Sequence, residues 1–171
     1  QIDESFAHLR TKQLDLLQIH NLLDWREHVP TLRALQAAGR VRYSGITHYR
    51  ADAHADLERV LGEEKFDWLQ INYSLAEREA EQRLLPFCRD RGIAVMVNRP
   101  FADGAMFAKA RGRPLPDWAE EIGCRSWGQF FLRFVVSHPA VTCVIPATSK
   151  PQHMIDNAAA GLGRLPDEQQ R

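Results

Sequence analysis

Five pairs of polar residues recur along the chain, each at the end of a short apolar run or shortly after it. Their imidazole, hydroxyl, amide and guanidinium groups can hydrogen-bond a ligand or move a proton near neutral pH. The pairs are His20 and Asn21, Thr47 and His48, Asn72 and Tyr73, Asn98 and Arg99, and Thr148 and Ser149. One such pair would be unremarkable, because a strand must end in something polar. Five in register indicate a ring of ligand-binding loops at one face of a barrel.

The apolar runs before these pairs are the expected strands. They span Leu14–Ile19, Val41–Ile46, Trp68–Ile71, Ile93–Val97 and Val141–Ile145. Four of the five are rich in β-branched residues and almost continuously apolar, which is typical of parallel strands covered on both faces.

Segments with helical periodicity lie between the expected strands. Val29, Leu32 and Leu35 form one apolar stripe, and Gly39 follows it as a stop signal. The apolar segment Trp127–Val136 predicts a core helix that ends before Pro139. Further helices are expected near residues 2–9, 53–61, 84–92 and 152–160.

Strands and helices alternate with a period of about 25 residues, which predicts an α/β fold with right-handed βαβ units. An open doubly wound sheet and a closed barrel both fit this order. No GxGxxG follows a strand, and the polar strand ends favour a (β/α)8 TIM-barrel type.

Such a barrel needs eight strands, so we expect residues 1–171 to form a single partial barrel domain of about five βα units. Gln1 lies within an expected helix, and we expect the N-terminal strands of the parent protein, on the order of 75–100 residues, upstream of it. The open edges predict self-association or pairing with that missing part.

Composition excludes several classes of protein. Lysine plus arginine and aspartate plus glutamate number 22 each among 171 residues, so no basic excess indicates nucleic-acid binding. No apolar stretch approaches the ~18 residues of a membrane span, and we expect a cytoplasmic protein. Cys88, Cys124 and Cys143 are far apart and lack CxxC spacing, so free thiols are expected.

Several segments, taken in order, resemble the aldo/keto reductase family. Leu14–His20 is similar to the strand that ends in the family's catalytic histidine, and Gly39–Thr47 is similar to the next strand segment. The other similar segments are Gln70–Ser74, Arg99–Gly104, Ile145–Ser149 and Asp156–Asn157.

The resemblance implies that NADP(H), or alternatively NAD(H), transfers hydride to the carbonyl carbon of a small aldehyde or ketone. His20 would orient the carbonyl oxygen and assist proton relay. The residues expected to bind the cofactor come from the strand ends and the two last loops: Thr47, His48, Gln70, Asn98, Arg99, Pro100, Phe101, Asp103, Gly104, Thr148, Ser149, His153, Asp156 and Asn157.

The chain also departs from the family pattern. The family's catalytic aspartate, tyrosine and lysine precede the histidine strand, so we expect this chain alone to be inactive. Asn98 stands where an aromatic ring commonly stacks on nicotinamide. Ala147 and His153 stand where basic residues often bind the 2′-phosphate of NADP, which leaves the choice between NADP and NAD open.

Two other functions remain as alternatives. The first is a non-catalytic reductase-like module that binds nucleotide or a partner protein. The second is a metal-dependent barrel hydrolase using His20 and His48, although no His-x-His and no suitably spaced acidic residue supports it. Some of the motifs also have purely structural interpretations: Ser149–Gln152 has the pattern of a helix capping box, and Asp103-Gly104 is turn chemistry.

Overall fold

The computed structural model describes all residues 1–171 and contains five strands and seven α-helices. The strands are β1 (Leu14–Ile19), β2 (Val41–Thr47), β3 (Trp68–Asn72), β4 (Ala94–Asn98) and β5 (Cys143–Val144). The helices are α1 (Ile2–Leu9), α2 (Trp25–Ala37), α3 (His54–Glu63), α4 (Leu84–Asp90), α5 (Ala105–Ala110), α6 (Trp127–Val136) and α7 (Pro151–Ala159). Short 3-10 turns follow or precede them: η1 (His20–Leu22), η2 (Ala51–Ala53), η3 (Glu79–Glu81), η4 (Ala102–Gly104) and η5 (Asp117–Ala119).

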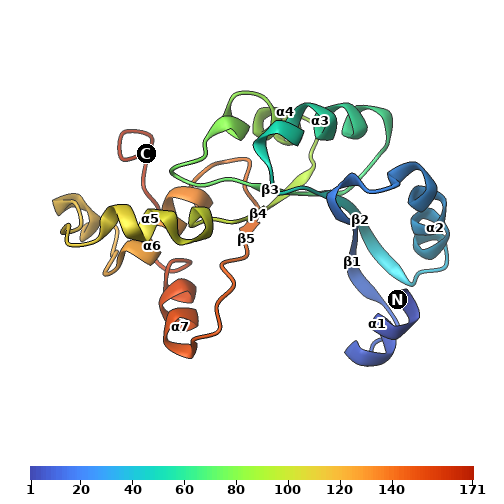
Figure 1. Cartoon of the computed structure of the whole chain (residues 1–171), viewed down its shortest axis with the longest axis horizontal. Coiled ribbons are helices and arrows are strands. Elements are labelled where there is room, and N and C mark those ends of the chain that lie inside the picture. The colour runs from blue at the N-terminus through green and yellow to red at the C-terminus, as the bar shows by residue number, and fades with distance from the viewer.

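The strands form one parallel sheet in the order β1-β2-β3-β4-β5. Each strand therefore lies beside the next one in sequence, which is the order of a barrel wall, and the α/β barrel prediction is confirmed for the part present. In Figure 1, α2, α3 and α4 follow one another around one side of the sheet, while α1 and α7 lie near its two ends. β1 and β5 are unpaired edges.

The last strand is shorter than expected. The prediction of Val141–Ile145 was wrong in length, because only Cys143 and Val144 pair with β4. Ile145 still donates its N–H to the Val97 carbonyl, but Pro146 after it has no N–H to continue the ladder, and β5 has a neighbour on one side only.

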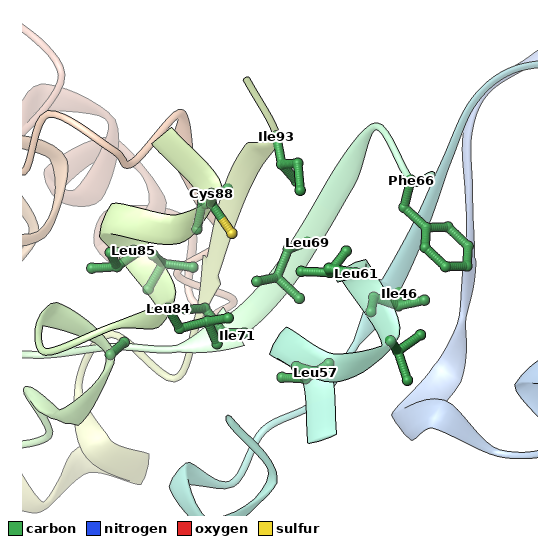
Figure 2. Packing of buried hydrophobic residues seen from close by; sticks show 14 of the residues in the cluster. Ile46, Leu57, Leu61, Phe66, Leu69, Ile71, Leu84, Leu85, Cys88 and Ile93 are labelled. Carbon is green, nitrogen blue, oxygen red and sulfur yellow. The ribbon is translucent and has the colours of Figure 1, made fainter. Parts of the chain in front are cut away.

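The hydrophobic core lies between the sheet and its helices. Leu69, Ile71 and Val95 of the strands and Leu57 and Leu85 of the helices are all completely buried. Figure 2 shows the side chains of α3 and α4 meeting those of β2 and β3 in this layer. Fully burying one such side chain contributes about 1.5–3 kcal/mol, so this layer dominates the stability of the fold.

The opposite face of the sheet is not covered in the same way. Side chains alternate between the faces of a strand, and the alternate set includes Tyr43, Trp68 and Met96. These are exposed or only half-buried. The helices therefore cover one face of the sheet as expected, and the expectation that the other face is covered too was wrong for this chain.

Helix ends follow the sequence signals with one exception. α6 has the expected bounds, and the Ser126 hydroxyl accepts a hydrogen bond from the Gln129 N–H as its cap. The capping-box interpretation of Ser149 was wrong: α7 begins one residue later, with Lys150 at the N-cap position and no side-chain cap.

The three cysteines are free, and none of the helices is both long and apolar enough to cross a membrane.

Candidate active site

The carboxyl ends of β1 and β2 are joined by a hydrogen bond. His20 opens η1 directly after β1, is exposed, and has no side-chain hydrogen bond. The next residue, Asn21, has a left-handed backbone (φ 52°), and its N–H donates to Oγ1 of Thr47 at 3.0 Å. Thr47 is therefore fixed and buried, whereas the His20 imidazole is free to meet a ligand.

The loop after β2 is anchored to β4. Nδ1 of His48 accepts a hydrogen bond from the Arg50 N–H at 3.2 Å. Nδ2 of Asn98 donates to the carbonyl oxygen of His48 at 3.0 Å, which leaves Oδ1 of Asn98 buried without a partner. Burial lowers the pKa of His48 below its usual 6.5, so its ring is neutral near pH 7.

Gln70 lies in register with Thr47 on one side and Met96 on the other. Its side-chain amide makes no hydrogen bond within the protein, so both its oxygen and its nitrogen are available. Asn72, by contrast, is held by the His54 ring and by Glu77, at 3.2 Å each.

A strained loop follows β4. Arg99, Ala102 and Asp103 all have positive φ angles near 50°, which non-glycine residues rarely adopt. The Arg99 guanidinium donates to both carboxylate oxygens of Asp103, at 3.0 and 2.8 Å, and to the Tyr49 carbonyl at 2.9 Å. Glu77 lies 3.6 Å from the same guanidinium, an ion pair that the sequence did not indicate.

A cavity of about 690 Å³ adjoins this loop. Its walls come from the loop after β4, the first turn of α6, the loop after β5, and α7. The predicted site residues that line it are Arg99, Pro100, Phe101, Asp103, Gly104, Thr148, His153, Asp156 and Asn157.

The remaining predicted residues lie outside this cavity. Five of them lie at the strand ends: His20, Thr47, His48, Gln70 and Asn98. Ser149 is exposed and lies neither at a strand end nor in the cavity wall. Ser126, Trp127 and Gly128 line the cavity but were missed, because α6 was interpreted as core packing alone. The glycine in its first turn was the available signal, since a helix glycine often marks a close approach.

A larger hollow of about 850 Å³ lies at the amino ends of β3 and β4, beside Phe66, Asp67 and Ile93. Ligands of parallel α/β folds bind at the carboxyl ends of the strands, so the cavity beside Arg99 is the stronger candidate. No three histidine, cysteine or acidic side chains gather at a spacing that would hold a metal ion.

Comparison with known proteins agrees with this arrangement. The sequence model of the aldo/keto reductase family matches residues 1–171. The uncharacterized oxidoreductase YcsN of Bacillus subtilis is 28% identical over 163 residues, covering 90% of this chain and 54% of that protein. The NADH-specific methylglyoxal reductase of Escherichia coli is 35% identical over 80 residues, covering 47% of this chain and 24% of that protein.

A solved aldo/keto reductase from Klebsiella pneumoniae in complex with NADP and acetate superposes with a TM-score of 0.72 at 27% identity. The alignment covers 98% of this chain and 60% of that one. The chain therefore belongs to the aldo/keto reductase family and has the fold of part of its barrel. It spans about half the length of relatives such as YcsN.

Proposed function

We propose that this chain forms the cofactor-binding part of an NAD(P)H-dependent reductase that converts an aldehyde or ketone to an alcohol. The observation that carries the proposal is the cavity at the carboxyl ends of the strands, whose lining includes Arg99, the residue after Asn98 with its buried, unpartnered Oδ1. Membership of a family of NAD(P)-dependent oxidoreductases supports the same activity.

The residues present fit a nicotinamide dinucleotide. Oδ1 of Asn98 lacks a donor and the Gln70 amide is free, so together they can hold a carboxamide group. Arg99 adjoins the cavity and suits a diphosphate, while Thr148 and Asn157 offer hydrogen-bonding groups to a nucleoside. The Klebsiella protein carries NADP and the E. coli relative is NADH-specific, so both forms remain candidates.

The bound cofactor supplies the hydride, and the chain's own residues orient the substrate. His20 is exposed at the end of β1 and unbonded, so its imidazole can donate to the carbonyl oxygen. None of the three tyrosines stands where the family has its proton donor: Tyr73 is completely buried and bonded to Glu81, Tyr43 lies at the amino-end hollow, and Tyr49 stacks on His48 in the loop after β2. We propose that the acid, with its lysine and aspartate, belongs to a further segment of a longer protein.

The test is NADPH oxidation with an aromatic aldehyde, followed by absorbance, on the 171-residue chain and on a longer parent protein that includes a segment upstream of Gln1. Loss of a general acid typically costs ~10²–10⁴ in rate, so the chain alone should show negligible turnover. In the parent, His20→Ala should lower turnover at least about tenfold, which is ~1.4 kcal/mol, with little change in cofactor affinity.

Two results would contradict this account. Turnover by the pure 171-residue chain would overturn the division of catalytic residues, and a His20→Ala parent with full turnover would falsify the role of His20. A parent that binds cofactor but never reduces a carbonyl would favour the alternative, a nucleotide-binding module. That alternative also fits the cavity, because its polar lining residues, Arg99, Thr148 and Asn157 among them, suit a nucleotide without any catalytic group.

A further inference from the structure

Helix α7 forms one wall of the cavity but is only weakly attached by apolar packing. None of its residues is buried, and Met154 and Ile155 are 51% and 72% exposed. His153, Asp156 and Asn157 of this helix nevertheless line the cavity. Polar contacts must therefore fix its position.

Those contacts converge on Asp156. The Ser126 hydroxyl donates to Oδ2 of Asp156 at 2.6 Å, and Nε2 of Gln129 donates to Oδ1 at 2.6 Å. Both carboxylate oxygens are thus occupied by donors from the first turn of α6. Hydrogen bonds to an ionised carboxylate are among the stronger ones in proteins.

The two donors are themselves held in place. Oγ of Ser126 accepts from the Gln129 N–H at 3.1 Å, and Oε1 of Gln129 accepts from the Arg125 N–H at 3.0 Å. Gln129 is only 6% exposed. Gly128 lies between them, and a Cβ there would come within 3.1 Å of Oδ2 of Asp156. The first turn of α6 is therefore shaped to receive this carboxylate.

Asn157, the residue after Asp156, links α7 to the loop after β5. Nδ2 of Asn157 donates to the Pro146 carbonyl at 3.2 Å, and Pro146 begins the loop that lines the cavity with Ala147 and Thr148. The contacts therefore run from α6 through Asp156 to α7, and through Asn157 to the loop after β5.

We propose that Asp156 is a positioning residue and not a ligand contact, and that Ser126 and Gln129 act through it to hold the nucleoside-binding wall of the cavity. The sequence-based expectation had Asp156 touching the cofactor. This inference rests on the proposed function, because it assumes that the wall receives an adenine nucleotide.

The test uses adenosine 5′-diphosphoribose as the probe, measured by calorimetric titration of the 171-residue chain. Gln129→Met keeps the size of the side chain but removes its donor, and should weaken binding roughly tenfold. Ser126→Ala should weaken it in the same direction. Gln152→Ala, at an exposed position on α7 outside the cavity lining, is the matched control and should bind as the wild type does.

Exchanging the donor and the acceptor between residues 129 and 156 distinguishes a positioning role of Asp156 from direct contact with the ligand. Asp156→Asn alone should weaken binding, and the combination of Gln129→Glu with Asp156→Asn should restore it to within about twofold, since an amide–carboxylate bond is rebuilt in reverse. If the Asp156 carboxylate contacted the ligand directly, the second substitution would not restore ligand binding. Circular dichroism and melting temperature check that each variant is folded.

The outcomes are distinguishable. If the folded wild type binds no adenosine 5′-diphosphoribose, the proposed function and this inference fail together. If the wild type binds but Gln129→Met binds equally well, or the double variant stays as weak as Asp156→Asn, only the positioning role is overturned. Should Gln129→Met fail to fold, Ser126→Ala and the rescue pair decide the question by the same criteria.

Discussion

At the scale of single residues, the polar groups at the strand ends fall into two kinds. Thr47, Asn72 and Arg99 make hydrogen bonds to other protein groups. His20, Gln70 and one atom of Asn98 do not. The buried Oδ1 of Asn98 is costly unless a ligand completes its hydrogen bond, whereas water can serve the exposed His20 and the half-buried Gln70 until a ligand displaces it. We therefore assign these free groups to the nicotinamide end of the cofactor and to the substrate, and the Arg99 guanidinium at the cavity to the diphosphate.

A second polar network, away from the cavity, makes stability depend on pH. Glu81 accepts hydrogen bonds from Arg78, at 3.1 and 2.7 Å, from the Tyr73 hydroxyl, and from Arg171 at 3.4 Å. Burial alone would raise the pKa of Glu81, but Arg78 and Tyr73 together outweigh it and lower the pKa below 4.5. A carboxylate with a lowered pKa in the folded state stabilises the fold above its unfolded pKa, and this is lost as pH falls.

Glu81→Gln should therefore reduce the free energy of unfolding by about 1–3 kcal/mol at pH 7 and by much less near pH 3, where more of Glu81 is protonated. Urea unfolding of both proteins at the two pH values measures the difference. An equal loss at pH 7 and pH 3 would show that the charge of Glu81 is not what stabilises the fold.

At the scale of elements, the packing of β2 against β3 depends on a glycine. A Cβ on Gly45 would lie 2.8 Å from the Trp68 carbonyl oxygen and 3.1 Å from the Gln18 side chain. The backbone oxygen cannot move without shifting the strand. Gly45→Ala should thus destabilise the chain by about 1–3 kcal/mol.

Gly62 provides the matched control for this prediction. It lies in α3, and a Cβ added there would have no atom within 4 Å, so Gly62→Ala should be neutral or stabilise by up to about 1 kcal/mol. Melting temperatures of the two variants test the contrast. A Gly45→Ala chain as stable as Gly62→Ala would mean that the strands are not this close.

The elements also show what sequence patterns can predict. Apolar runs and polar ends predicted β1 to β4 nearly to the residue, because periodicity and burial are local properties. β5 was predicted, but its shortness was not, since its length depends on having one neighbour only. The contacts of Asp156 with Ser126 and Gln129 join residues 30 and 27 positions apart, and no local pattern predicts such a pairing.

At the scale of the whole molecule, the sheet has two unpaired edges and one poorly covered face. Unpaired edges favour pairing with another chain. The 171-residue chain should therefore self-associate at high concentration in sedimentation velocity, and a longer parent that completes the barrel should not. A clean monomer of the chain across the concentration range would contradict this prediction.

The central claim is that this chain binds the nicotinamide cofactor through the cavity beside Arg99 and the free groups of Gln70 and Asn98 at the strand ends. Titration of the folded chain with NADPH and with NADH, followed by quenching of tryptophan fluorescence, tests it directly, since Trp127 lines the cavity. We predict saturable one-to-one binding of at least one of them, weakened by Gln70→Ala and unchanged by Gly62→Ala. No saturable binding of either cofactor at millimolar concentration would contradict the claim.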